Sequence, residues 1–468
     1  MDPAAVRNDP GRGATRRLAD FAATLNYGDL DAETRHAAKR HILDTLGACL
    51  AGSTQPVTDA AEAVLAQSLA EGPVPVPGRR RRADAATAAY LGGVAGHGLE
   101  LDDGYRPGSV HPGCVVVPAA FAAAYELGAS GPEVLTGVTA GYEVAARIAA
   151  AAQPGLRRRG FHATGACGVF GAAAAVGALH GLDTQAMAHA FGLAASSAGG
   201  LFAFTGGGGE VKRLHAGQAA RGGLLAALMA KRGVAGPPAV LECPDGFFQA
   251  FAGDESPRIG EAAGRDGFAI AQCYIKPYAC CRHFHGALEA LFEILDAEDL
   301  DPASVERIEV GTYAFAAAHG SVGWDDMATA QLSFPFVMAT ALHARGVGIE
   351  HFSEAARCDP KVTADCAKIA VAVDADCEAR YPRVRPAKVT LHAAGGRIFL
   401  RSVDEPLGAP RNPLDDAALG DKYLGLAGPV LGPERARETL AELWRLDEIH
   451  SVARLCDALA GSARSQKS

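Results

Sequence analysis

The chain has 468 residues, of which 49% are hydrophobic and 21% charged, so it carries ample apolar material for a core and is not expected to be disordered. This length exceeds the roughly 100–200 residues of a typical domain and favours two domains. The net charge of −9 argues against nucleic acid or an anionic membrane as a partner.

Targeting features are not evident in the sequence. Residues 1–17 are polar and lack the apolar stretch of a secretory signal. The longest uncharged runs, residues 161–182 and 184–209, consist largely of Ala and Gly, which suits packed helices better than a membrane span. Eleven cysteines show neither the spacing of a disulfide framework nor a C-x-x-C pair. We therefore expect a cytoplasmic protein.

Helical periodicity dominates the first 270 residues. Over Thr34–Leu50, apolar side chains recur near one face, Asp31 or Thr34 is a suitable N-cap, and Gly52 is a stop. Further helices are predicted over Asp84–His97, Val117–Leu127, Pro132–Ala152, Val169–His180, Thr184–Ala194, Ala216–Arg232 and Pro244–Ala252. Small side chains allow helix axes to approach closely, so we expect a dense all-helical domain.

Strand patterns begin after residue 268. Alternation over Val305–Ala316, Lys368–Val373 and Lys388–Val403 predicts strands, the last of them a hairpin around Gly395. Helices are predicted over Phe284–Glu298 and Ser333–Arg345, and again over Pro433–Glu448 and His450–Ala460. The prediction is a mainly α fold: a discontinuous helical domain of residues 1–268 plus 404–468, and a smaller α+β domain of residues 269–403.

The first polar cluster follows the helix predicted to end at His97. Glu100, Asp102 and Asp103 lie in four consecutive residues, and His111 separates this loop from a very apolar segment. A histidine held beside carboxylates can act as a general base near neutral pH. A capped, solvated loop is the alternative interpretation.

Two further clusters lie at predicted helix starts. His162 precedes a small-residue helix whose first N–H groups could bind a carboxylate. Lys212 and His215 follow four glycines, where an ammonium could approach an anionic ligand. A structural cap and a surface loop are the respective alternatives.

A fourth cluster, KPYACCRHFH at residues 276–285, lies near the predicted domain junction. It contains Lys276, Cys281, Arg282 and a His-x-His pair. Residues two apart on a helix point away from each other, and no second cluster has zinc-site spacing, so we expect no metal. Tyr313 with His319 is a fifth and weaker candidate, which core packing explains equally well.

The sequence contains no recognisable nucleotide-binding or G-x-S-x-G motif. Several His, Lys and Arg residues with a few acids suit proton transfer beside a carboxylate, since cations can delocalise the charge while His or an acid moves the proton. Dehydration, decarboxylation and epimerisation share such a carbanion, and the residue inventory alone does not choose among them.

The segments ELDDGYRPGSVHPG (100–113), RGFHATG (159–165), KRLHAG (212–217) and IKPYACCRHFHG (275–286) resemble the MmgE/PrpD family. The resemblance runs in matching order from about residue 15 to 460. It implies a discontinuous helical domain, an α+β lid domain, a homodimer and cofactor-free chemistry on a small anionic substrate in the cleft between the domains. The family includes 2-methylcitrate dehydratases, cis-aconitate decarboxylases and iminodisuccinate epimerases.

Carried over by position, the resemblance implies that Asp102 or Asp103, His111 and His162 are catalytic, and that Lys212 and Lys276 bind substrate carboxylates. Three positions depart from the decarboxylases: Glu100 replaces an Asp, Gly104 a Thr and Cys281 a His. These changes argue against that specific decarboxylation. Arg282 could supply the cation that the missing His would have supplied, and we add Glu100, Cys281 and His215 to the expected substrate-binding set.

We therefore predict a cofactor-independent hydro-lyase that dehydrates a 2-hydroxy polycarboxylate resembling 2-methylcitrate. An isomerase or epimerase acting through the same carbanion, on a dicarboxylate or a specialised metabolite, is the first alternative. A non-catalytic ligand-binding relative is the second, although a scaffold gains little from burying so many polar groups.

Overall fold

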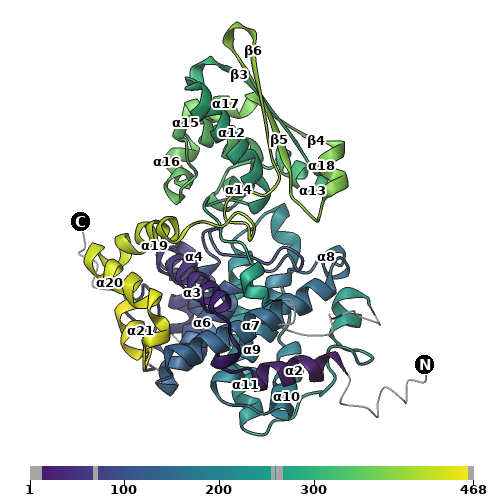
Figure 1. The fold of residues 1–468 in the computed structure, drawn as a ribbon, viewed down its shortest axis with the longest axis vertical. Coiled ribbons are helices and arrows are strands. Elements are labelled where there is room, and N and C mark those ends of the chain that lie inside the picture. The colour runs from purple at the N-terminus through teal and green to yellow at the C-terminus, as the bar shows by residue number, and fades with distance from the viewer. Residues whose placement is uncertain (1–12, 67–71, 255–258, 260–266, 462–468) are drawn as a thin grey trace. The chain divides into compact units, whose positions relative to one another are not determined.

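The computed structural model describes residues 13–66, 72–254, 259 and 267–461. The chain divides into two compact units (Figure 1). Unit 1 comprises residues 1–98, 102–274 and 415–468, and unit 2 comprises residues 99–101 and 275–414. The domain boundaries predicted from the sequence lie instead at 268/269 and 403/404. The short segment 99–101 makes unit 2 discontinuous as well.

Unit 1 is helical apart from a two-stranded antiparallel ribbon of β1 (Val74–Pro75) and β2 (Arg82–Ala83). Its helices are α2 (Ala14–Thr24), α3 (Ala32–Gly52), α4 (Pro56–Ala66), α5 (Ala85–Gly96), α6 (Gly113–Leu127), α7 (Gly131–Ala152), α8 (Gly155–Arg158), α9 (Ala163–Leu179), α10 (Thr184–Ala195), α11 (Val211–Lys231), α19 (Asp416–Leu431), α20 (Pro433–Trp444) and α21 (Ala453–Leu459). The C-terminal helices pack back on this unit, with α19 against α3.

Side-chain caps fix the beginnings of the long helices. The Asp31 side chain accepts a hydrogen bond from the Thr34 backbone N–H at the start of α3, and Asp84 does the same for the first turn of α5. Ser130 and Glu133 form a reciprocal capping box on α7. Such caps satisfy the backbone N–H groups that a helix start leaves without partners.

Glycine and alanine allow the central helices to approach closely. At the contact between α7 and α9, a Cβ on Gly171 would lie 2.6 Å from the Gly141 carbonyl oxygen, and a Cβ on Gly141 would lie 2.7 Å from the Gly171 carbonyl oxygen. Only a residue without a side chain fits such a backbone approach. The residues of α9 from its start to Gly177 are all buried, so this helix is the centre of the unit 1 core.

Unit 2 is built on a four-stranded sheet of order β4-β3-β5-β6. Its elements are α12 (His285–Glu298), β3 (Val305–Thr312), α13 (Ala314–Ala317), α14 (Met327–Leu332), α15 (Phe334–Ala344), α16 (Glu354–Arg357), α17 (Pro360–Asp365), β4 (Ile369–Val373), α18 (Ala375–Arg380), β5 (Ala387–Ala393) and β6 (Arg397–Val403). Strands β3 and β4 are parallel, whereas β3–β5 and β5–β6 are antiparallel. Helix α12 packs on β5 and β6.

The predicted mainly α fold with a small α+β part is confirmed, and so is the predicted hairpin, which is β5–β6. Two local predictions were wrong. Over Pro244–Ala252, only Phe248–Ala252 forms a π-helical turn, because Pro244, Asp245 and Gly246 form a turn in which Asp245 has φ of 60°. The strand predicted over Val305–Ala316 ends at Thr312 and α13 follows. Among the described residues, no helix is long and apolar enough to span a membrane.

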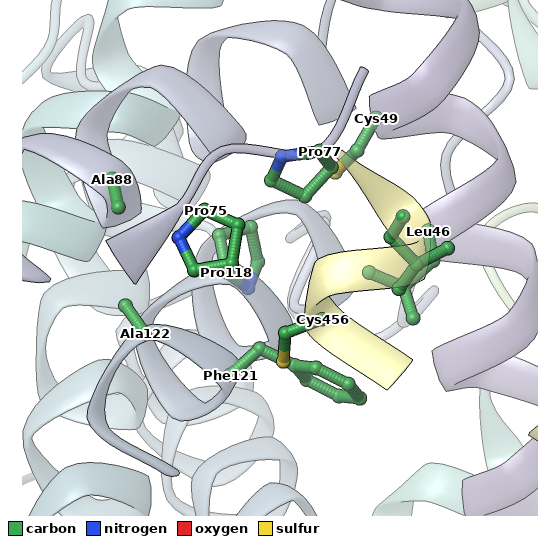
Figure 2. Close-up of a pocket in the computed structure, with 10 residues that line it drawn as sticks. Leu46, Cys49, Pro75, Pro77, Ala88, Pro118, Phe121, Ala122 and Cys456 are labelled. Carbon is green, nitrogen blue, oxygen red and sulfur yellow. The ribbon is translucent and has the colours of Figure 1, made fainter. Parts of the chain in front are cut away.

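Unit 1 contains an apolar pocket whose lining includes Leu46, Cys49, Pro118, Phe121 and Cys456 (Figure 2). Prolines, alanines and leucines complete the lining. The polar clusters predicted from the sequence are not among the lining residues, so the site described next lies elsewhere in the unit.

Replacing Gly171 with Ala should destabilise the protein by about 1–3 kcal/mol, because the added methyl would force α7 and α9 apart. The matched control is Gly425→Ala on α19, where a Cβ would meet no atom within 4 Å. This control should be neutral or should stabilise the helix by up to about 1 kcal/mol. Urea unfolding of the three proteins measures both effects, and equal midpoints for Gly171→Ala and the parent would contradict the packing account.

Candidate active site

The loop between α5 and α6 is anchored by Asp103, which is completely buried. Its Oδ2 accepts a hydrogen bond from the Tyr142 hydroxyl at 2.8 Å and lies 2.7 Å from His41 Nδ1. Its Oδ1 accepts from the backbone N–H of Gly113 at 3.0 Å, at the beginning of α6. These contacts fix the loop against α3, α6 and α7 and favour a positioning role for Asp103. His41 and Tyr142 were not predicted from the sequence.

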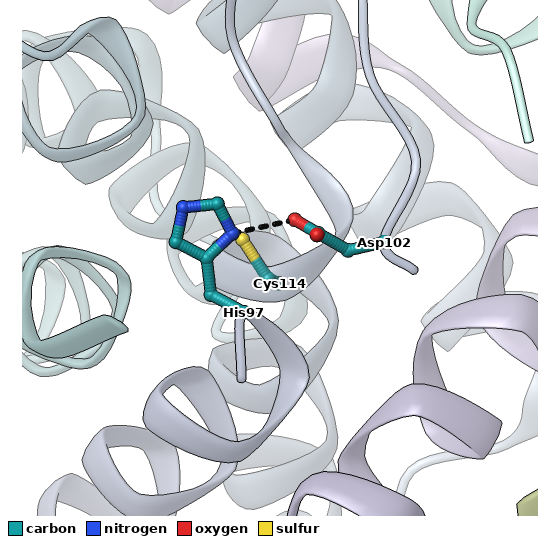
Figure 3. A group of neighbouring side chains, drawn as sticks. All are labelled: His97, Asp102 and Cys114. Atoms are coloured by element: carbon teal, nitrogen blue, oxygen red, sulfur yellow. Dashed lines mark hydrogen bonds and ion pairs between the residues drawn. The ribbon is translucent and has the colours of Figure 1, made fainter. Parts of the chain in front are cut away.

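The neighbouring Asp102 carboxylate is also completely buried and is shared by two histidines. Its Oδ2 lies 2.7 Å from His97 Nδ1 and 3.2 Å from His111 Nδ1. Figure 3 shows the hydrogen bond between His97 and Asp102. Burial by itself raises the pKa of Asp102, but the adjacent His97 and His111 outweigh burial and hold this pKa well below its usual range. Asp102 is therefore an ionised carboxylate.

The contacts of His111 determine which of its nitrogens can exchange a proton. Nδ1 lies 2.6 Å from the Asp103 carbonyl oxygen and 3.2 Å from Asp102 Oδ2. Both of these oxygens are acceptors, so Nδ1 carries a hydrogen. Nε2 is then the nitrogen of His111 that can take up or release a proton, and the Asp102 carboxylate lies against the other side of the ring.

His162 lies immediately before α9, where its backbone N–H donates to the Gly200 carbonyl oxygen. Its Nδ1 is 3.1 Å from His215 Nδ1 on α11, so one of the two rings donates to the other. The Phe202 and Phe204 rings present their edges or faces to His162 at centroid distances of 5.8 and 5.3 Å. The ring is thus held between two phenylalanine rings and His215.

Burial is the first cause that lowers the pKa of His162 well below its usual value, and the positive charge of Lys212 adds to this effect. The neighbouring His97 and His215 also lower it. Lys212 is itself buried on the first turn of α11. His162 is consequently a neutral imidazole at neutral pH and suits the role of a base.

One residue that was not predicted connects these two groups. The His97 ring lies 5.0 Å from the His111 ring and is stacked on the His162 ring at 5.6 Å, measured between centroids. The structure therefore brings Asp102, His111, His162, Lys212 and His215 into one cluster within unit 1. The sequence pattern identifies His97 only as the last residue of a predicted helix. Its position three residues before the acidic segment is the feature that could have indicated its place in the site.

His97, Asp102 and Cys114 are close enough together to be considered as metal ligands (Figure 3). Their geometry does not fit a zinc site. Two ligands of a tetrahedral zinc at 2.0–2.1 Å would lie about 3.4 Å apart, whereas His97 Nδ1 and Asp102 Oδ2 are at the 2.7 Å of a direct hydrogen bond. Burial and the nearby carboxylates also raise the pKa of the Cys114 thiol well above its usual value, which disfavours the thiolate that a metal needs.

The remaining predicted residues belong to unit 2. Lys276 is buried, and its Nζ donates to the Glu100 carbonyl oxygen at 3.0 Å and to the Glu100 carboxylate at 3.2 Å. Glu100 has φ of 54°, in the left-handed region that is uncommon for a residue with a side chain. Glu100 and Asp102, which lie two positions apart in one sequence motif, belong to different units.

Arg282 and Cys281 are also buried in unit 2. The Arg282 guanidinium donates to the carbonyl oxygens of Pro406 and Leu407, at 3.0 and 2.7 Å, and these bonds hold the segment that follows the sheet. The Cys281 backbone N–H donates to the Gln331 carbonyl oxygen. The Tyr313 hydroxyl is hydrogen-bonded to His283 Nδ1.

Gly104 is enclosed by Tyr274 within unit 1. The backbones of the two residues are hydrogen-bonded to each other, and a Cβ at position 104 would lie 2.3 Å from the Tyr274 hydroxyl oxygen. A side chain at position 104 therefore requires Tyr274 to move. Gly104, which stands where the decarboxylases have a Thr, is therefore packed closely against Tyr274.

Comparisons with known proteins place the chain in a family. A cis-aconitate decarboxylase of Aspergillus terreus is 28% identical over 473 residues, covering 96% of each chain. The human cis-aconitate decarboxylase is 26% identical over 466 residues, covering 96% of this chain and 95% of its own. The family models of the MmgE/PrpD N-terminal and C-terminal domains match residues 16–260 and 278–447. The chain belongs to the MmgE/PrpD family, and its relatives support an enzyme of the lyase type.

Proposed function

We propose that the protein is a cofactor-independent lyase that removes a proton beside a carboxylate of a 2-hydroxy polycarboxylate and expels the neighbouring hydroxyl group as water. The observation that carries this proposal is the presence of two histidines with opposite electrostatic surroundings in one buried cluster. His162 is held neutral, whereas His111 lies against the ionised Asp102. An elimination needs one base and one acid, and such a pair provides both.

The base is His162. Because its Nδ1 is engaged with His215 Nδ1, the nitrogen available for a substrate is Nε2. For Nε2 to act as the base, Nδ1 carries the hydrogen and donates it to His215. The proton moves from the substrate carbon to Nε2, and the electron pair it leaves is delocalised into the adjacent carboxylate. The Lys212 ammonium stabilises this negative charge.

The acid is His111 in its imidazolium form. Its Nδ1–H remains hydrogen-bonded to the Asp103 carbonyl oxygen and Asp102, while Nε2–H is transferred to the departing hydroxyl. The C–O bond breaks, water leaves, and a carbon–carbon double bond forms. Asp102 stays ionised throughout and acts by holding the ring and stabilising its charge.

Decarboxylation of an unsaturated polycarboxylate is the second candidate, and the decarboxylase relatives favour it. It would use the same carbanion, with CO2 leaving in place of the first proton. The chain has Gly104 and Cys281 at positions where the decarboxylase pattern has a Thr and a His, and a side chain at 104 would require Tyr274 to move. For this reason we place dehydration first.

Substituting His162 or Lys212 with Ala should lower turnover by about 10²–10⁴-fold, because each change removes a group that acts on the developing carbanion. His180 and Lys231 are matched controls of the same residue types, since they pair with each other on the exposed side of unit 1. His180→Ala and Lys231→Ala should keep normal turnover. Circular dichroism and steady-state rates are measured for all four. Turnover like that of the parent in His162→Ala and Lys212→Ala would contradict the assignment.

The reaction itself is tested by incubating the purified protein in D2O with a panel of hydroxy-, amino- and unsaturated polycarboxylates and following each compound by proton NMR. We expect an olefinic product and loss of water from one hydroxy acid. Deuterium uptake without a double bond would establish the isomerase instead, and CO2 release would establish the decarboxylase. A folded protein that changes no member of the panel would contradict a polycarboxylate substrate.

A further inference from the structure

His97 is a buried polar residue to which the proposed mechanism gives no role. It caps the C-terminal end of α5 and is 1% exposed. Burying a polar side chain costs free energy unless its hydrogen bonds to water are replaced. His97 replaces one of them, from Nδ1 to Asp102.

The contact with Asp102 fixes the tautomer of His97. Because the carboxylate is an acceptor, Nδ1 carries the hydrogen, and in the neutral ring Nε2 keeps a lone pair. Burial is the largest of several influences, and together they lower the pKa of His97 to about 4, so the ring is neutral at neutral pH. His97 therefore does not compete with His111 or His162 as a charged acid.

The titratable and charged groups around His97 come from three helices, the start of a fourth and the loop after α5. They are Cys49 on α3, Cys114 on α6, His162 at the start of α9, and Lys212 and His215 on α11, together with His111, Asp102 and Asp103 in the loop after α5. Of these, Asp102 is the group to which His97 is hydrogen-bonded, and His111 contacts the same oxygen.

We propose that His97 is a positioning residue: by donating Nδ1–H to Asp102 Oδ2, it fixes the carboxylate against His111 and limits how strongly that carboxylate holds the His111 proton. The proposal rests on the lyase mechanism above for its consequence in catalysis. Its physical content, a coupling between His97 and the titration of His111, does not depend on the substrate.

The direction of this coupling follows from the shared oxygen. A neutral N–H donor withdraws part of the negative charge that Oδ2 would otherwise direct at the His111 imidazolium. Without this donor the carboxylate has one fewer hydrogen bond in a buried environment, so its attraction for the His111 proton increases. Removing the His97 donor should therefore move the His111 titration to higher pH and make His111 a weaker acid toward the leaving group.

The test uses the full chain labelled with ¹⁵N-histidine, and the His111 signal is assigned by its disappearance in His111→Gln. His97→Ala and His97→Phe remove the donor, and Phe also keeps most of the ring volume. His97→Asn is the conservative control, because its amide N–H can replace Nδ1–H. We expect the midpoint of the His111 titration to rise by about one pH unit in the Ala and Phe variants. In the Asn variant it should remain near that of the parent.

An unchanged midpoint in whichever of His97→Ala or His97→Phe remains folded would overturn the proposal. So would a shift in His97→Asn as large as that in His97→Ala, since this would assign the effect to lost packing. Once a substrate is known, the limb of the kcat/KM profile that belongs to His111 should move in the same direction. If the parent protein turns over no polycarboxylate, the lyase proposal fails. The titration of His111 in the variants still tests whether His97 and His111 are coupled.

Discussion

The buried, ionised carboxylate of Asp102 is the constraint on which the rest of unit 1 depends. A buried carboxylate without partners would take up a proton or destabilise the folded state, so it needs hydrogen-bond donors fixed around it. His97 from the end of α5 and His111 from the loop before α6 supply them. Asp103, held by Tyr142, His41 and the first turn of α6, keeps the loop in place so that these donors stay aligned. The geometry of the acid in the proposed reaction is therefore set by the same contacts that make the buried charge tolerable.

His162, the proposed base, is positioned by different contacts. The close approach of α7 and α9 at Gly141 and Gly171 packs α9 into the centre of the core, and His162 lies directly before its first residue. The buried ring is thus held beside His215 and Lys212 of α11 in surroundings that disfavour its charged form. One cluster consequently contains a neutral imidazole and a second imidazole held against a carboxylate, the pair that the proposed lyase reaction needs.

Much of this site could be predicted because its residues interrupt otherwise apolar sequence. Asp102, His111, His162 and Lys212 stood out for that reason. The residues that were missed lie inside regular helical patterns and meet their partners only through the fold: His41 and Tyr142 are 62 and 39 positions away from Asp103. Arg282 shows a different limit of prediction from sequence. Its cationic side chain suggested an anion site, yet it is hydrogen-bonded to two backbone carbonyls far along the chain, a use that no local pattern reveals.

We propose His162 as the neutral base of an acid–base pair whose two histidines have different surroundings. The most direct measurement is a ¹⁵N-histidine NMR titration of the unmodified protein, with the His162 signal assigned by its loss in His162→Gln. Because burial and Lys212 disfavour its charge, we expect His162 to stay neutral through pH 7 and to take up a proton only well below its ordinary pKa of 6.5. A His162 ring that is already protonated at pH 7 could not accept the substrate proton and would contradict the account.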